Sequence, residues 1–300
     1  MKIHRHQIYF LVIVFGLAAG VLLNCAGGQK LAVTNLKCEY LKNPLGIDIP
    51  QPRLSWTVSS NLRGISQSAY RILVADNREF LRDDTGNIWD SGEVSSAQSV
   101  NVVYDGEQLQ SGDTYYWKVR IWNQDAEQSP WSEINTFHTG LLQPSDWEAE
   151  WITAGDAALQ APLLRTKFEV DKRIESAHAY VTGVGYYELY LNGGKVGDHV
   201  LDPGMTNYRK RVLYTTYDVT DQLNSGVNAA GIILGNGAYR MERVEGRYSW
   251  GGGGAAFGAP RALLQLDIAF SDGTEKRIIT DGSWQSSSGP ITFNHFYGGE

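Results

Sequence analysis

The sequence has 300 residues, and its 33 acidic residues outnumber its 26 basic residues to give a formal charge of −7. Because an acidic surface repels phosphate, this balance argues against a nucleic-acid partner. Nine Trp, sixteen Tyr and 33 Gly, without a long amphipathic helical pattern, favour β-sandwiches over helical domains.

Residues 1–24 have the layout of a secretory signal peptide. Lys2 and Arg5 precede an almost wholly apolar run from Ile8 to Leu23, which is too short and wrongly flanked for a membrane span. Cys25 follows at the position where a bacterial lipoprotein signal is cut and acylated. The sequence therefore predicts an exported protein, periplasmic or an outer-membrane or cell-surface lipoprotein, which meets the membrane only through this signal or a lipid on Cys25. An ordinary cleaved signal that ends near a cysteine is the alternative.

Residues 30–139 are predicted to form an immunoglobulin-like sandwich. The closing stretch TYYWKVRIWNQDAEQSPWSEINTFHTG resembles the last two strands of a fibronectin type III module, with Trp117, Val119 and Ile121 alternating with polar neighbours. Trp56 lies inside a strand pattern and is expected to be a core residue, with a sugar-stacking platform as the alternative. The domain is expected to act as a spacer. Turn residues separate seven expected strands, the count of an immunoglobulin-like domain: Leu31–Tyr40, Leu54–Val58, Ala69–Ala75, Ile88–Ser91, Ser99–Tyr104, Thr114–Asn123 and Glu133–His138.

Residues 147–300 are predicted to form a second sandwich, which is organised around the stretch Tyr186 to Thr220. In YYELYL, Tyr187, Leu189 and Leu191 alternate with more polar residues, as in a half-buried strand. The dipeptide Asn192-Gly193 tolerates positive φ and predicts a hairpin turn, and Asp202-Pro203-Gly204 predicts a second turn. The loops are expected to gather at one end of this unit.

The remaining elements indicate a jelly-roll-type sandwich after a linker at residues 140–146. The sequence ends at Glu300 in the middle of this domain, which indicates a fragment of a longer chain. The other expected strands are Trp147–Thr153 at an edge, Pro162–Val170, Ile174–Val181, Val212–Val219, Gly231–Leu234, Arg261–Phe270, Lys276–Thr280, Ser283–Gln285 and Ile291–Phe293.

The central stretch resembles a known family. ELYLNGGKVGDHVLDPGMTNYRKRVLYTTYDVTDQL, with VTGVGYYE before it and LGNGAYR after it, is similar to the N-terminal β-sandwich of bacterial α-L-rhamnosidases, glycoside hydrolase family 78. The resemblance continues through WEAEWIT and GPITFNHFYGGE, and so covers nearly everything after the signal. In that family the catalytic carboxylates lie in a helical (α/α)6 barrel further along the chain. The resemblance therefore gives no catalytic residue here and implies a downstream catalytic domain as partner.

The carboxylates of this chain suggest no catalytic pair of their own. Glycosidic hydrolysis needs two carboxyl groups ~5–10 Å apart, and no spacing selects such a pair from Glu188, Asp198, Asp202 and Asp218. Asp202 is better explained as the start of a turn, and Asp218 as a cap where a strand ends. The 300-residue chain alone is expected to be inactive.

Sugar binding is the more modest expectation. Related sandwiches in rhamnosidases bind rhamnose, some with calcium. The resemblance therefore implies an L-rhamnose-containing oligo- or polysaccharide as the ligand. Calcium is a candidate ion, and no cofactor is expected to be required. Where the family commonly has aromatic residues, this chain has Met205 and Ala238, and Tyr239, Tyr248 or Trp250 would replace them. The structural alternatives are that Asn192-Gly193 is only a hairpin turn and Arg209 only a solvated strand end. The candidate ligand-binding residues are Asn192, Asp202, Asn207, Arg209, Asn236, Tyr239, Arg240 and Trp250.

Three functions are compatible with the sequence. The favoured one is the non-catalytic N-terminal part of an exported α-L-rhamnosidase that hydrolyses terminal α-L-rhamnose from glycans, with the second sandwich recognising rhamnose. The second is a stand-alone surface lipoprotein that binds rhamnose-containing glycans without cutting them. The third is a structural spacer that binds no sugar.

Overall fold

The computed structural model describes residues 31–241 and 257–299. The chain forms two compact units: one comprises Gln51–Glu107 and Tyr115–Thr136 with the segment before Asn43, and the other comprises Pro44–Pro50, Gln108–Thr114 and the chain from Phe137 onward. The predicted signal, Cys25 and Trp250 lie outside the described residues. Each unit is described separately below.

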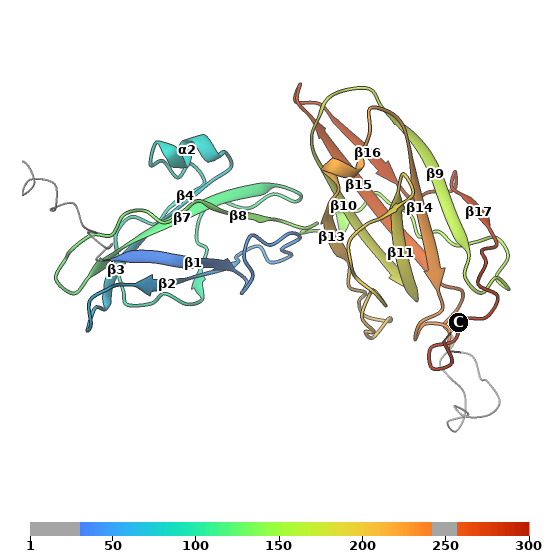
Figure 1. Cartoon of the computed structure of the whole chain (residues 1–300), viewed down its shortest axis with the longest axis horizontal. Coiled ribbons are helices and arrows are strands. Elements are labelled where there is room, and N and C mark those ends of the chain that lie inside the picture. Colours follow the sequence, from blue (N-terminus) through green and yellow to red (C-terminus); the bar gives the residue numbers. More distant parts are fainter. Residues whose placement is uncertain (1–30, 242–256, 300) are drawn as a thin grey trace, which may run out of the picture. The chain divides into compact units, whose positions relative to one another are not determined.

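The first unit is a sandwich of short antiparallel strands, as predicted, with one strand more than the seven expected. One sheet has the order β1 (Ala32–Cys38), β2 (Arg53–Ser59), β6 (Val102–Val103). The other has the order β4 (Trp89–Asp90), β3 (Gln67–Ala75), β7 (Thr114–Asn123), β8 (Asn135–His138), and the additional β5 (Val94–Ser95) pairs with β3 (Figure 1).

The core of the first unit has the residues that the alternation predicted. Trp117, Val119 and Ile121 on β7 are almost completely buried. Trp56 is also buried, and its indole N–H donates a hydrogen bond to Gln67 Oε1 at 2.9 Å. A buried indole N–H needs such a partner, so Trp56 has a structural role in this core.

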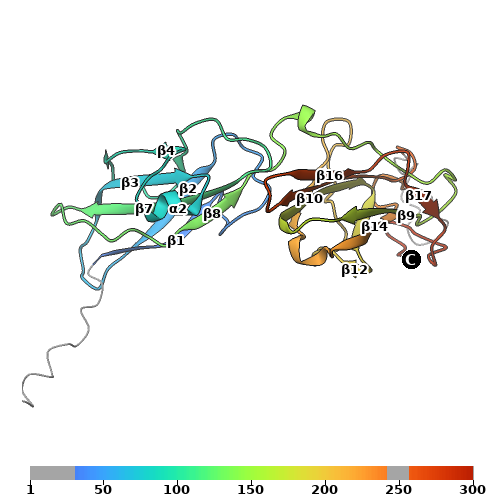
Figure 2. The ribbon, with the colours of Figure 1, turned by 90° about the horizontal axis from the view of Figure 1, so that it is seen from above.

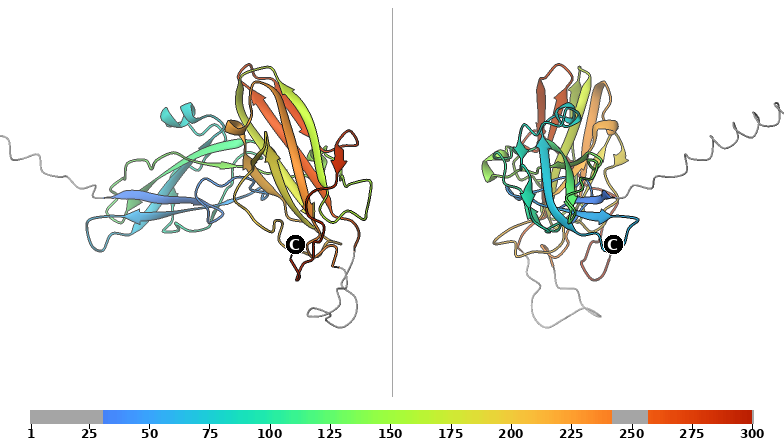
Figure 3. Two further views of the ribbon diagram at one scale, coloured as in Figure 1. Left: turned by 45° about the vertical axis from the view of Figure 1, so that its right-hand side comes forward. Right: turned by 90° about the vertical axis from the view of Figure 1, so that its left-hand side faces the viewer.

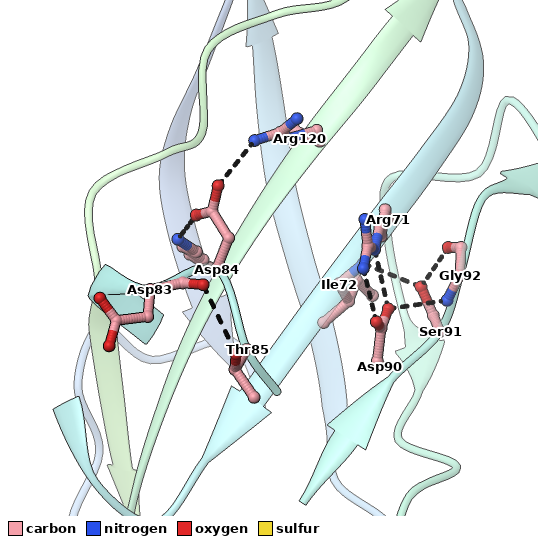
Figure 4. A network of polar contacts seen from close by, with 10 residues as sticks. Arg71, Ile72, Asp83, Asp84, Thr85, Asp90, Ser91, Gly92 and Arg120 are labelled. Carbon is pink, nitrogen blue, oxygen red and sulfur yellow. Dashed lines mark hydrogen bonds and ion pairs between the residues drawn. The ribbon is translucent and has the colours of Figure 1, made fainter. Parts of the chain in front are cut away.

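A short helix that the sequence analysis did not predict, α2 (Arg78–Arg82), covers the outer face of β3. Asn77 caps it by accepting a hydrogen bond from the backbone N–H of Glu79 at 2.9 Å, and Leu81 packs against Leu73 and Ala75. Two ion pairs lie on the same sheet. Figure 4 shows Asp84 beside Arg120 at 3.6 Å, and the ion pair of Arg71 with Asp90 at 2.6 Å.

The second unit is a sandwich of two antiparallel sheets, which confirms the predicted fold class. Figure 2 shows the two layers, and Figure 3 shows them from two further sides. The four-stranded sheet has the order β13 (Thr215–Asp218), β10 (Ile174–Val184), β15 (Arg261–Phe270), β16 (Glu275–Ile279). The five-stranded sheet has the order β12 (Gly194–Lys195), β11 (Tyr186–Leu191), β14 (Gly226–Gly235), β9 (Leu163–Val170), β17 (Gln285–Ser287). Two 3₁₀ turns, Pro144–Asp146 and Thr220–Gln222, precede β9 and β14.

The core of the second unit lies between these two sheets. Tyr187, Leu189 and Leu191 of β11 are buried, as the period of two predicted, and they pack with Ile232 of β14 and Leu264 of β15 in one cluster. The other residues of β11 lie on the opposite, outer face of the five-stranded sheet. That outer face is therefore available for contacts other than core packing.

Several predicted boundaries are wrong. Trp147–Thr153 is not a strand, because after the 3₁₀ turn only Ile152 pairs, in an isolated bridge to Ala262. Ile291–Phe293 forms no strand, and β13 begins at Thr215 rather than at Val212. The predicted strand Gly231–Leu234 is the end of the ten-residue β14, whose Gly- and Ala-rich first half is held by pairing with β9.

The described part of the chain has a single α-helix, the five-residue α2, so no helical barrel occurs in residues 31–241 and 257–299. Within the same ranges, no helix has the length and apolar character needed to cross a membrane.

Candidate ligand-binding site

The register of the five-stranded sheet separates the candidate residues into two groups. Tyr186, at the start of β11, pairs with Gly235 at the end of β14, and Leu191 pairs with Ala230. Asn236 to Arg240 therefore follow one end of the sheet, and Asn192 lies at the other end. The expectation that all the loops gather at one end is wrong for Asn192.

Asn192 forms the hairpin turn between β11 and β12. With a φ of 52°, it adopts the left-handed conformation that Asn tolerates. Its Oδ1 accepts the backbone N–H of Ala229 at 2.9 Å, and its Nδ2 donates to Gln222 O at 2.9 Å and to Asn228 Oδ1 at 2.8 Å. These bonds use the amide to join the turn to β14, so the structural role predicted for Asn-Gly is present here.

Asp202 fixes the loop that follows β12. Its Oδ2 accepts hydrogen bonds from Tyr187 Oη at 2.7 Å and from Thr215 Oγ1 at 2.8 Å, and its backbone oxygen accepts the N–H of Tyr187 at 2.9 Å. Burial, followed by the contact with Asp202, raises the pKa of Tyr187, so this phenol stays a donor. Asp202 thus holds the loop against the start of β11.

Asn207 and Arg209 lie on a turn within the same loop. Asn207 Oδ1 accepts the N–H of Arg209 at 3.2 Å, and Asn207 O accepts the N–H groups of Lys210 and Arg211. Arg209 itself is exposed. The turn places Tyr208 against two further rings.

Tyr208, Tyr239 and Phe257 form an aromatic cluster. Tyr239 and Phe257 are stacked, with centroids 5.6 Å apart and an interplanar angle of 21°, and Tyr208 meets both rings edge-on at 5.2 and 5.6 Å. Phe257 is 44% exposed, whereas Ala238 beside Tyr239 is buried. The cluster gives this end of the sandwich a partly exposed apolar surface of the kind on which a sugar ring can stack.

Asn236 and Arg240 tie neighbouring loops to this end. Asn236 is 1% exposed, and its Nδ2 donates to Asn294 O at 2.7 Å and to Gln160 Oε1 at 3.2 Å. Arg240 Nη1 donates to the backbone oxygens of Ala157 at 2.8 Å and Leu159 at 3.3 Å. Most of these polar atoms are engaged in positioning loops, so Arg209 and the aromatic cluster remain the more accessible part of the candidate site.

Comparison with known proteins identifies both units. Residues 172–300 match the model of the α-L-rhamnosidase N-terminal domain, and residues 33–143 match that of the Rha78A-like N-terminal immunoglobulin domain. An α-L-rhamnosidase of Formosa agariphila is 39% identical over 313 aligned residues, which cover 95% of this chain and 33% of that protein. This chain has the N-terminal domains of the α-L-rhamnosidase family.

Solved rhamnosidase structures share the fold of this region. The α-L-rhamnosidase of Dictyoglumus thermophilum has a TM-score of 0.81 at 37% identity, over 89% of this chain and 31% of that one. The enzyme of Aspergillus terreus has a TM-score of 0.76 at 34% identity, over 90% of this chain and 31% of that one. The chain thus spans about a third of the length of these three α-L-rhamnosidases.

The described residues of the second unit were compared with the requirements of a catalytic carboxyl group and of a metal site. The hydrogen bond from Lys195 at 2.5 Å lowers the pKa of Glu188, which makes this carboxyl a poor general acid. No group of three or more His, Cys, Asp or Glu that could hold a metal occurs in residues 31–241 and 257–299. Calcium also binds carbonyl and amide oxygens, so the calcium expectation stays a prediction.

Phe257 and Tyr208 were not among the predicted ligand residues. Tyr208 lies between two of them, and an aromatic residue between Asn207 and Arg209 was the available signal. Phe257 follows a glycine-rich stretch and is far from Tyr239 in sequence, so only the fold brings it to the cluster.

Proposed function

We propose that this chain is the non-catalytic N-terminal part of an exported enzyme that hydrolyses terminal α-L-rhamnose from glycans. The observation that carries the proposal is the match of both units to N-terminal domains of α-L-rhamnosidases, with 37% identity to one solved enzyme over 89% of this chain. On this proposal the general acid and general base lie on a downstream helical domain. Export follows from the predicted signal, with a lipid on Cys25 as the anchor to the membrane.

The second unit is proposed to contribute L-rhamnose recognition. The aromatic cluster supplies a flat apolar surface for the apolar face of the sugar, and the exposed Arg209 supplies donors for its hydroxyl groups. A calcium ion held by backbone and amide oxygens at the same end of the sandwich is proposed as an optional part of this site.

The proposal is tested by titrating the recombinant chain with L-rhamnose in a calorimeter, with calcium and with a chelator. We expect binding by the wild type, at least tenfold weaker binding by Tyr239→Ala, and unchanged binding by Phe80→Ala, which removes an exposed aromatic ring from α2 instead. The same chain should release no product from an aryl α-L-rhamnoside. Absence of rhamnose binding would contradict the recognition role, and turnover above the blank would contradict the non-catalytic role.

A further inference from the structure

The outer face of the five-stranded sheet has one row of residues that crosses all five strands. Tyr190 of β11 pairs with Lys195 on one side and with Gly231 of β14 on the other, Gly231 pairs with Arg165 of β9, and Arg165 pairs with Gln285 of β17. Their sequence neighbours Leu189, Leu191, Ala230, Ile232 and Leu164 are buried in the core, so this row lies on the outer face. The row has a glycine at its centre.

Gly231 leaves a gap between the two sides of the row. A methyl group there would lie 4.0 Å from Tyr190 Cβ and 3.8 Å from Leu164 O, so the space above the glycine is open. The next outward residue of β14 towards the hairpin is Ala229, which is also small. Together they form the floor of an open groove of about 920 Å³, bordered by Tyr190, Arg165 and Gln285. This volume is within the range of small-molecule sites.

The β11 side of the groove presents a fixed aromatic ring. Tyr190 Oη donates to Glu188 Oε2 at 2.8 Å, and Lys195 Nζ donates to Glu188 Oε1 at 2.5 Å. The ring is therefore held in place at the border of the groove. An aromatic ring beside polar side chains suits a pyranose, which has apolar C–H faces and a hydroxyl edge.

The outer face of β9, beside the groove, carries two cations, Arg165 and Lys167, and one carboxylate, Glu169. Arg165 Nε and Nη2 both lie 3.3 Å from Gln285 Oε1, a neutral acceptor, and Lys167 is exposed two residues further along the same face. Among the described residues, neither cation has a carboxylate within ion-pair distance, and Glu169, the next outward residue of β9, is in no ion pair. Arg53 and Arg277, by contrast, are paired with carboxylates at 2.5 and 2.6 Å.

We propose that this groove binds an acidic oligosaccharide, with one sugar ring above Gly231 against Tyr190 and a carboxylate or sulfate at Arg165 and Lys167. Arg presents a planar array of donors that suits an oxyanion, and the neighbouring ammonium adds a second charge. The proposal deepens the proposed function, on which it rests, by naming an anionic glycan as the substrate class. The groove is distinct from the aromatic cluster, so the two sites can be tested separately.

The test uses the recombinant chain and a tetrasaccharide of alternating rhamnose and galacturonate, titrated in a calorimeter beside its carboxyl-reduced counterpart. We expect the acidic form to bind at least tenfold more tightly than the reduced form and to weaken as NaCl is raised from 0.05 to 0.5 M. The double variant Arg165→Gln/Lys167→Gln should lose at least tenfold in affinity for the acidic form, and Gly231→Val, which fills the gap, should lose binding of both forms. Arg63→Gln removes an exposed cation from the first unit and should behave as wild type.

Four outcomes would overturn the proposal. Equal affinity for both tetrasaccharides, or an unaffected double variant with a wild-type melting temperature, would show that Arg165 and Lys167 do not bind the anionic group of the ligand. Binding of free L-rhamnose without binding of the acidic tetrasaccharide would refute the groove while leaving the proposed function intact. A dimer in sedimentation that Gly231→Val dissociates would identify a second copy of the chain as the occupant.

Discussion

At the scale of single residues, most side chains that the sequence predicted to bind a ligand instead form hydrogen bonds that stabilise the fold. Asn192 joins a hairpin to β14, Asp202 anchors a loop to Tyr187, and Asn236 joins two loops. Each of these side chains makes at least one hydrogen bond within the unit, and separating such a partly buried pair is unfavourable. The groups that remain free for a ligand are aromatic or cationic and lie on the surface.

His138, which ends β8 but belongs to the second unit, predicts how that unit responds to acid. His138 is 1% exposed, its ring stacks on His178 at 3.9 Å, and its Nε2 lies 3.0 Å from Tyr180 Oη. Burial, and then the charge of His178, lowers the pKa of His138 to about 3, although Asp218 acts in the opposite direction. Between these pKa values, the unfolded chain, with a His pKa of about 6.5, binds a proton at this residue and the folded chain does not. The free energy of unfolding therefore falls as the pH drops below about 6.5.

We expect this histidine alone to remove about 2 kcal/mol of unfolding free energy between pH 7 and pH 5. Urea unfolding at the two pH values measures this change in the wild type and in His138→Gln. The variant has no titrating group at this position, so its free energy of unfolding should fall by that much less. An equal loss in wild type and His138→Gln would contradict the assignment.

At the scale of elements, the second sandwich depends on a corner at Gly185. β10 belongs to the four-stranded sheet and β11 to the five-stranded sheet, and Gly185 is the single residue between them. Its φ is 99°, and a Cβ there would lie 2.3 Å from Gly235 O and 2.9 Å from Pro260 Cβ. Only glycine fits both the dihedral angle and the space.

Gly185→Ala should therefore destabilise the second unit by at least about 3 kcal/mol, because backbone strain and a clash with backbone atoms add together. Gly193→Ala is the matched control, since its φ is 85° but nothing lies within 4 Å of a Cβ there. It should lose only about 1–2 kcal/mol. The urea unfolding midpoint of Gly185→Ala should be clearly lower than that of Gly193→Ala. Similar midpoints would contradict the structural role proposed for Gly185.

The elements also show what the sequence could predict. Alternation predicted β7 and β11, the strands β9 and β15 were also predicted with nearly correct bounds, and Asn192-Gly193 predicted the hairpin. The first half of β14 was missed because Gly and Ala have low strand propensity and this strand is held by its neighbours. The five-residue α2 is too short to show a helical period.

The groove on the outer face was missed for a related reason. Gly231 read only as part of a short buried strand, and its position between Tyr190 and Arg165 follows from pairings between residues 41 and 66 positions apart in sequence. The local sequence pattern of a strand does not determine the register in which it pairs with strands that are distant in sequence. The aromatic cluster is similar, because Phe257 reaches Tyr239 only in the folded chain.

At the scale of the whole molecule, the chain consists of two units that resemble the N-terminal domains of longer enzymes. Both units match N-terminal domains of α-L-rhamnosidases, and the chain covers 33% of the Formosa agariphila protein. Neither unit offers a carboxylate pair for hydrolysis that the sequence or the described structure singles out. The proposed division of labour therefore places glycan recognition here and bond cleavage on a downstream domain.

The most direct test of this claim is the size of the native protein, measured by blotting cells that produce it with an antibody raised against residues 30–139. The account predicts a band at roughly three times the 33.3 kDa of this chain, since related enzymes are about three times as long. A band at about 33 kDa would contradict it, because no downstream catalytic domain would then exist and a stand-alone glycan-binding lipoprotein would be the better description.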